Sequence, residues 1–240
     1  MTKYYTRACN FYSGQKSYEL VKNKLALPLN DNSLLSFDTI EIISRKEKRK
    51  IHIKDINKQS HKVKKKIKED IKSIIGKKKF KGLNLKKFPI LMGVVNLTPD
   101  SFSDGGKYNK KNLGYKYASL LIKNGCEILD IGGESTRPGA KDINKKIEWR
   151  RINKTLKKVT KLKKFISIDT RKSWIMEKAI KSNINLINDV SGLDYDKNTK
   201  HILKKYNIPF VIHHMVGTPK NMQKKAKYKN VLLDVYDFFE

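Results

Sequence analysis

Several residue types and patterns are scarce in this 240-residue chain, and each scarcity argues against a particular class of protein. Only two cysteines are present, Cys9 and Cys126, and they form no metal or redox motif. No apolar run approaches the roughly 20 residues of a membrane-spanning helix. The first residues, MTKYYTRACNFYSG, lack the apolar core of a secretion signal. We therefore expect a cytoplasmic protein with reduced thiols and no membrane partner.

Acidic residues are also scarce, since 23 Asp and Glu stand against 54 Lys and Arg, a formal net charge of +31. Such an excess is typical of proteins that bind nucleic acids or anionic ligands. The lysine runs, however, alternate with isoleucine, whereas single-stranded nucleic acid sites interleave basic residues with exposed aromatics. We interpret most of the charge as solvated helix faces and keep a basic RNA-binding protein as the disfavoured alternative.

Residues 1–88 contain no catalytic pattern. Alternating apolar residues in 39–44 and 50–56, separated by the charged turn 45–49, predict a β-hairpin. Apolar residues at helical spacing predict an amphipathic helix over 60–75. We expect a small, basic α+β extension that ends in a linker over 77–87, with this helix packed on the main domain through its apolar face. That face consists of Val63, Ile67, Ile71, Ile74 and Ile75.

From residue 90 onward, short apolar segments alternate with helical patterns. Strands are predicted over 90–96, 127–133, 165–170, 185–191 and 209–215, and helices over 115–124, 145–164, 173–183, 198–206 and 228–240. Repeated βα units predict an α/β fold in which a parallel sheet is covered by helices. An open doubly wound sheet and a TIM barrel both fit this rhythm. Because no GxGxxG or P-loop pattern follows any strand, the nucleotide-binding sheet is disfavoured.

Polar residues recur at the C-terminal end of each predicted strand. Along the chain they are Asn96, then Asp130 with Glu134, Ser135, Thr136 and Arg137, then Asp169, then Asn188 with Asp189, and finally His213 with His214. One such residue is readily explained as a helix cap, but five successive strand ends are harder to explain in that way. In a (β/α) barrel this edge carries the active site.

The side chains at these strand ends suit three kinds of partner. A carboxylate such as Asp169 accepts two parallel hydrogen bonds from adjacent N–H groups, and Asn188 offers both a donor and an acceptor to a heterocycle. The Asn96 amide oxygen suits a hard cation such as Mg²⁺. Together they predict a heterocycle rich in N–H groups and a metal ion.

Two further groups complete this interpretation. Arg137 suits the oxygens of a phosphate or carboxylate, which predicts an anionic group on the ligand. His213 and His214 are adjacent, so on a strand they face opposite sides and only one can face the site. We expect a structural role for them rather than a zinc site.

Five segments occur in the order of one known family, which this sequence resembles. They are GVVNLTPDSFSDGG, DIGGESTRPGA, SIDT, INDVSGL and HHMVGTPKNMQ, and the family is dihydropteroate synthase. The resemblance covers about residues 89–240 and implies a TIM barrel. It also implies a transferase of folate biosynthesis that joins 6-hydroxymethyl-7,8-dihydropterin pyrophosphate to p-aminobenzoate and releases pyrophosphate.

The resemblance assigns expected roles to individual residues. Asn96 resembles the ligand of Mg²⁺ and pyrophosphate, and Asp169 and Asn188 resemble the residues that hold the pterin edge. Thr136 resembles a threonine that contacts substrate. The loop residues have similar counterparts: Asp104 resembles an aspartate that closes over the reacting carbon, and Phe102, Ser135, Arg137 and Pro138 resemble residues framing the p-aminobenzoate pocket, where sulfonamides also bind. The candidate catalytic residues are therefore Asn96, Asp104, Thr136 and Arg137.

The sequence departs from the family pattern in its length. A TIM barrel needs about 250 residues and eight βα units, whereas five units are predicted here. The family's later motifs, Asp-Pro-Gly, Ser-Arg-Lys and Arg-x-His, do not follow residue 215, and Ser44-Arg45-Lys46 copies one of them in letters only. We expect a truncated gene product or fragment holding the first five units of the barrel; a homodimer of the complete protein is compatible with the resemblance.

Two alternatives stay open besides RNA binding. In the first, the chain is an inactive fragment. In the second, it belongs to another pterin-binding enzyme on the same fold, such as a methyltransferase domain. The segment TPDSFSDGG argues against the methyltransferase.

Overall fold

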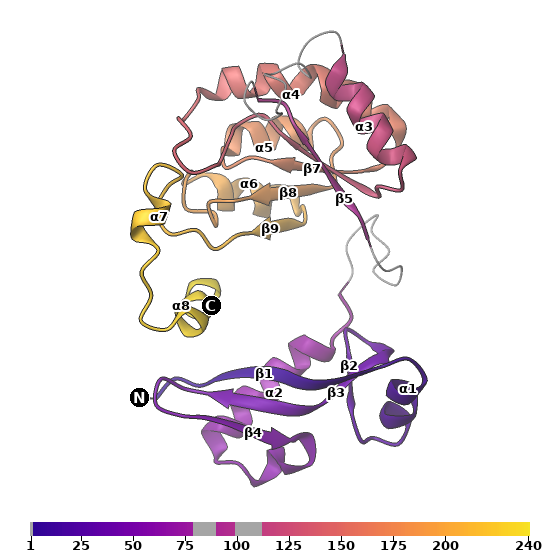
Figure 1. The fold of residues 1–240 in the computed structure, drawn as a ribbon, viewed down its shortest axis with the longest axis vertical. Helices are drawn as coiled ribbons and strands as arrows, with labels where there is room; N and C mark the ends of the chain where they lie inside the picture. Colours follow the sequence, from indigo (N-terminus) through magenta and orange to yellow (C-terminus); the bar gives the residue numbers. More distant parts are fainter. Residues whose placement is uncertain (1, 79–89, 99–111) are drawn as a thin grey trace. The chain divides into compact units, whose positions relative to one another are not determined.

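The computed structural model describes residues 2–78, 90–98 and 112–240 (Figure 1). The chain divides into two compact units: unit 1 comprises Met1–Lys78 and Tyr228–Glu240, and unit 2 comprises Lys79–Lys227. The last predicted helix therefore groups with unit 1, whereas the sequence analysis placed it in the barrel. No helix within the described ranges combines the length and apolarity needed to cross a membrane.

Unit 1 is built around one long antiparallel strand, β3 (Asn32–Ile43). It pairs with β1 (Tyr5–Ser13), β2 (Leu27–Leu29) and β4 (Lys48–His52). The pairing of β3 with β4 confirms the predicted hairpin. Helix α1 (Gly14–Lys22) joins β1 to β2, and a 3-10 helix, η1 (Ile53–Lys58), precedes α2 (His61–Ile75). The sequence analysis missed β1, α1 and β2.

Helix α2 buries its apolar face within unit 1. Val63 and Ile67 are buried in one cluster with Phe37, Ile40 and Ile42 of β3. The predicted burial of this face is confirmed, but the expectation that it packs on the main domain is wrong. The reason is that β3 itself presents an apolar sheet face, which the helix covers.

Helix α8 (Val231–Phe239) also packs in unit 1. Leu233 is buried against Tyr5 and Ile43. At the helix surface, Asp237 accepts hydrogen bonds from the Tyr5 hydroxyl at 2.6 Å and from Arg45 Nη2 at 2.7 Å. Exposed charges therefore surround a small apolar contact.

Unit 2 contains a five-stranded parallel sheet. Its strands follow one another in sequence order: β5 (Met92–Asn96), β6 (Ile128–Gly132), β7 (Phe165–Asp169), β8 (Leu186–Asp189) and β9 (Phe210–Ile212). The helices are α3 (Leu113–Lys123), α4 (Lys145–Val159) continued by η3 (Thr160–Leu162), α5 (Ser173–Ile180), α6 (Thr199–Tyr206) and the short α7 (Met222–Lys225). A doubly wound sheet reverses its strand order, and this one does not. The predicted partial (β/α) barrel is confirmed.

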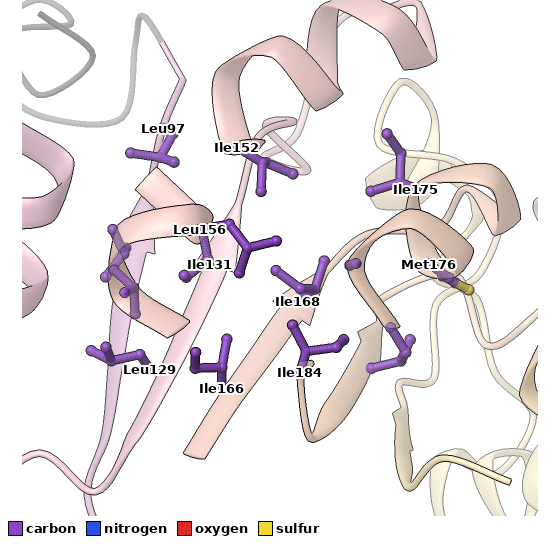
Figure 2. Close-up of a cluster of buried hydrophobic side chains, with 14 of the residues drawn as sticks. Leu97, Leu129, Ile131, Ile152, Leu156, Ile166, Ile168, Ile175, Met176 and Ile184 are labelled. Atoms are coloured by element: carbon purple, nitrogen blue, oxygen red, sulfur yellow. The ribbon is translucent and has the colours of Figure 1, made fainter. Parts of the chain in front are cut away.

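Helices α3 to α6 cover one face of this sheet (Figure 1). Figure 2 shows the resulting core, in which Ile131 and Ile168 of the strands meet Ile152 and Leu156 of α4. Side chains of a strand alternate between its two faces, so residues 128, 130 and 132 of β6 point away from this core. On the opposite face, Ile128, Phe165 and Leu186 cluster near the strand starts. Polar side chains follow on this face toward the C-terminal ends of β5, β7 and β8.

Candidate active site

Strand register places three of the predicted site residues, the metal candidate Asn96 and the pterin candidates Asp169 and Asn188, in one row. Asn96 is paired with Gly132, Gly132 with Asp169, and Asp169 with Asn188. Cross-strand partners point to the same face of a sheet, so the three polar side chains share the face opposite the helices. We call Asn96, Asp169 and Asn188 the polar row; all three are half-buried.

Gly132 keeps this row open. A Cβ atom at position 132 would lie 3.2 Å from Asn96 Oδ1 and 3.4 Å from Asp169 Oδ2. The hydrogen atom of glycine therefore leaves room for these two oxygens above the backbone of β6. Two oxygen atoms directed into one small space form a suitable partial site for a hard cation or for N–H donors.

Asp130 lies beneath the row and was given no role by the sequence analysis, which noted it only as a polar strand end. Asn188 Nδ2 donates to Asp130 Oδ2 at 3.0 Å, and His213 Nε2 lies 2.7 Å from Asn188 Oδ1. These two contacts set the orientation of the Asn188 amide. Asp130 is 4% exposed, and its buried Oδ1 atom has no hydrogen-bond partner. An acceptor in that condition awaits a donor from a ligand or water.

The carboxylates of this face repel one another. Burial and the nearby charge of Asp130 raise the pKa of Asp169 to about 7. Asp189 follows Asn188 and so belongs to the other face of the strand; burial raises its pKa as well, although Ser191 donates to this carboxylate through its backbone N–H and its hydroxyl. Among the described residues no ion pair reaches Asp130, Asp169 or Asp189. The face is thus an acceptor-rich surface that a ligand with several N–H donors would stabilise.

The remaining predicted residues lie on loops. Ser135, Thr136, Arg137 and Pro138 occupy the loop between β6 and α4, where the first two are half-buried and the last two exposed. Within the described part of the chain, no hydrogen bond joins this loop segment to the polar row. The structure therefore places the segment at the same end of the sheet without linking it directly to the row. Phe102 and Asp104 lie outside the described residues.

A metal site made by the protein alone does not occur in the described ranges. No three His, Cys, Asp or Glu residues there are grouped so as to hold an ion. Of the predicted histidines, His213 reaches the polar row through Asn188, which agrees with only one of the pair facing this side.

The sequence analysis also missed a charged cluster behind the row. Glu134, Glu148, Arg171 and Lys172 are buried and ion-paired. Arg171 and Lys172 directly follow the strand that ends at Asp169, but a charged pair after a strand usually marks a solvated turn. Their burial had no signal in the sequence.

Three comparisons relate this chain to known proteins. Residues 92–240 match the family described as pterin binding enzyme. Dihydropteroate synthase of Neisseria meningitidis serogroup C is 44% identical over 149 residues, 61% of this chain and 53% of that protein. Yersinia pestis dihydropteroate synthase, solved as a sulfonamide drug complex, has a TM-score of 0.62 at 33% identity and covers 68% of this chain and 59% of its own. Xanthomonas albilineans dihydropteroate synthase, solved with 4-aminobenzoic acid, has a TM-score of 0.57 at 34% identity, with coverages of 65% and 55%.

The chain spans about half the length of the curated relatives that it matches. Over that span, the parallel βα repeat and its ordered strands agree with the solved relatives. The family match extends over well more than half of the chain. This protein therefore belongs to the family of pterin binding enzymes.

Proposed function

We propose that this chain supplies the pterin-binding part of a dihydropteroate synthase. The reaction joins 6-hydroxymethyl-7,8-dihydropterin pyrophosphate to p-aminobenzoate and releases pyrophosphate. The observation that carries the proposal is the polar row at the C-terminal strand ends, with the buried Asp130 beneath it. The names of the relatives support the same reaction.

The pterin edge is matched by acceptors. Asp169 accepts two N–H groups of the aminopyrimidinone ring, and the free Oδ1 atom of Asp130 accepts a further one. Asn188, oriented by Asp130 and His213, retains one N–H donor for a ring nitrogen or carbonyl. This pattern discriminates against rings that lack adjacent donors, because a missing partner leaves a buried acceptor unsatisfied.

The anionic end of the substrate lies toward Asn96. The Asn96 amide oxygen, which lies beside the open space over Gly132, would hold Mg²⁺ there. Such an ion would supply positive charge to the departing pyrophosphate. Arg137 adds a cation from the loop after β6.

The loops serve the second substrate. Thr136, Ser135 and Pro138 frame p-aminobenzoate together with Phe102, so that its amine faces the pterin methylene carbon. Asp104 stabilises positive charge that develops on this carbon as the C–O bond to pyrophosphate breaks. Holding the amine in line with that carbon also lowers the activation barrier, because the two reacting groups are already oriented.

Calorimetry with a dihydropterin tests the pterin assignment. Asp169→Asn replaces one acceptor by a donor and should weaken binding by about 1–3 kcal/mol. Asp194→Asn, at an exposed position of the same unit, makes the same chemical change away from the row and should leave binding unchanged. Equal affinities for both variants would remove Asp169 from the pterin site.

Product formation tests the reaction. Dihydropterin pyrophosphate, p-aminobenzoate and Mg²⁺ are supplied to this chain alone and to this chain joined to the unmatched C-terminal residues of the Neisseria meningitidis relative. We expect dihydropteroate from the joined protein and none from the chain alone, because its sheet leaves apolar residues such as Met92 and Val94 exposed on the first strand. Absence of product from both proteins would contradict the proposed function.

A further inference from the structure

A buried network of charges lies directly behind the polar row. Lys172 Nζ donates to Glu134 Oε1 and to Glu148 Oε2, each at 2.7 Å. Arg171 Nε donates to Glu134 Oε2 at 2.9 Å, and Arg171 Nη2 donates to Asp142 Oδ1 at 2.6 Å. The two cations follow β7, whereas the acids belong to the loop between β6 and α4 and to α4 itself. The network therefore connects two neighbouring βα units.

Burial makes this network rigid. Glu134 is 6% exposed, Arg171 is 4% exposed, and Lys172 is 6% exposed. Burial alone would raise the pKa of Glu134, but the hydrogen bonds from Arg171 and Lys172 outweigh it and lower this pKa to about 2. Arg171 and Lys172 thus favour the ionised form of Glu134. Charge-assisted hydrogen bonds among planar groups also restrict geometry more than apolar contacts do.

The network closes the base of the loop that carries the predicted substrate residues. Glu134 Oε1 accepts the backbone N–H of Ile143 at 3.1 Å, so one carboxylate joins both ends of the segment 134–143. Near the second end, Asp142 accepts from Arg171 and from the Tyr195 hydroxyl at 3.0 Å. The Arg171 guanidinium lies 4.0 Å from the centre of the Tyr195 ring. Both ends of the loop are therefore held by residues that come after β7.

The same short segment anchors the loop and the pterin acceptor. Arg171 lies two residues after Asp169, the last residue of β7. We propose that Arg171, through Glu134 and Asp142, is a positioning residue that sets the loop 135–143 relative to Asp169, and thereby the distance between the two substrates. This inference rests on the proposed function. It predicts that loosening the network raises the KM for p-aminobenzoate and leaves dihydropterin affinity unchanged.

The test uses substitutions that the fold tolerates. The Asp142 side chain is 57% exposed, so Asp142→Ala removes the outer contact without opening the core. Asp142→Asn keeps an oxygen acceptor for Arg171 and should restore the wild-type behaviour. Arg171→Lys keeps the charge but cannot reach both acids at once. Lys205→Met, which removes an exposed ion pair to Glu177 in the same unit, is the matched control.

Two readouts separate positioning from general stability. In the 240-residue chain, hydrogen exchange should accelerate at the amides of residues 135–143 in Asp142→Ala and Arg171→Lys, but not at those of β7. In the joined protein, the KM for p-aminobenzoate should rise by about tenfold to a hundredfold in Arg171→Lys, with dihydropterin affinity unchanged. Asp142→Asn and Lys205→Met should match the wild type in both.

The inference and the proposed function fail in different ways. Wild-type exchange rates in the loop of Arg171→Lys overturn the positioning role, whatever the activity. Equal loss of dihydropterin affinity and of p-aminobenzoate binding also overturns it, because that result indicates general loosening. If the joined wild-type protein makes no dihydropteroate, the proposed function is wrong, and loop exchange alone then decides whether the network positions the loop.

Discussion

Two acids of unit 2, Glu134 and Asp169, have pKa values that shift in opposite directions. Glu134 meets two cations, Arg171 and Lys172, and its pKa falls to about 2 because their hydrogen bonds outweigh the effect of burial. Asp169 meets other acids instead, and burial together with Asp130 raises its pKa to about 7. Both carboxylates come from the C-terminal ends of neighbouring strands. Burial acts to raise the pKa of both carboxylates; Asp130 adds to this effect at Asp169, whereas the hydrogen bonds from Arg171 and Lys172 outweigh it at Glu134.

The presence or absence of a cation partner distinguishes carboxylates that stabilise the fold from carboxylates that are available to a ligand. A carboxylate with its own cations is satisfied within the fold and stabilises it, whereas a carboxylate without a partner is satisfied only when a ligand arrives. Asp130 Oδ1 is such an unsatisfied acceptor, and it lies on the face with the polar row. A third group, the exposed pairs around α8, contributes mainly to attachment of that helix.

The largest expected effect comes from breaking the satisfied group. Lys172→Met leaves Glu134 and Glu148 close together without their shared cation, and should lower the free energy of unfolding by about 3–5 kcal/mol. Denaturant unfolding followed by tryptophan fluorescence measures this, because the two tryptophans of the chain, Trp149 and Trp174, both lie in unit 2. Lys205→Met, in an exposed pair, should cause no measurable change. If both variants lost a similar free energy of unfolding, the buried ion pairs would contribute no more to stability than the exposed one.

Removing the charge of Asp169, which has no cation partner among the described residues, should instead raise the free energy of unfolding. The ordinary pKa of an aspartate is 3.8, and that of Asp169 in the fold is about 7. Ionisation of Asp169 therefore does not destabilise the folded state below pH 4, destabilises it increasingly between pH 4 and pH 7, and has its full effect above pH 7. Relative to the wild type, Asp169→Asn should gain about 2–4 kcal/mol in free energy of unfolding between pH 4 and pH 8. Asp194→Asn, at an exposed site, should show no such gain. A difference independent of pH would show that Asp169 is not strained by burial.

Dihydropterin binding should also depend on pH through the ionisation of Asp169. Because two N–H donors favour the ionised carboxylate, Asp169 must lose its proton when a dihydropterin binds below its pKa of about 7. The dissociation constant should therefore rise about tenfold for each pH unit below 7 and level off above it. Calorimetry across pH 5.5–8.5 measures this slope, which Asp169→Asn should abolish. A flat profile for the wild type would place the ionisation elsewhere.

The smallest effect is expected from the exposed charges around α8. Asp237 accepts from Tyr5, Lys3 and Arg45, and these contacts lower its pKa. Asp237→Asn should accelerate hydrogen exchange of the α8 amides by less than about tenfold at low salt. In 1 M salt, where the screening length falls to about 3 Å, variant and wild type should exchange alike. A difference that persists in high salt would show that packing, not charge, was lost.

Much of the fold could be predicted from the sequence because its signals are local. Alternation in β3 and β4, helical spacing in α2, and the βα rhythm each depend on neighbouring residues only. The polar strand ends Asn96, Asp169 and Asn188 were predicted for the same reason, since parallel strands bring their C-terminal ends to one edge of the sheet. The weakly patterned β1, α1 and β2 carried no such signal.

What covers each surface was decided by tertiary structure. The apolar stripe of α2 specifies burial but not a partner, and β3 provided that partner within unit 1. Likewise, Arg171 and Lys172 have the same sequence appearance as solvated charges, and only their packing against Glu134 and Glu148 buries them.

The sequence by itself thus determined the repeating units, the parallel sheet and the residue types at its edge, because these follow from periodicity along the chain. The tertiary structure decided which acids have cations and which do not. The reason is physical: a pKa and an ion pair depend on distances between residues far apart in sequence, and register across strands sets those distances. Asp130 illustrates this, since only its hydrogen bond with Asn188, two strands away in the sheet, reveals its place beneath the polar row.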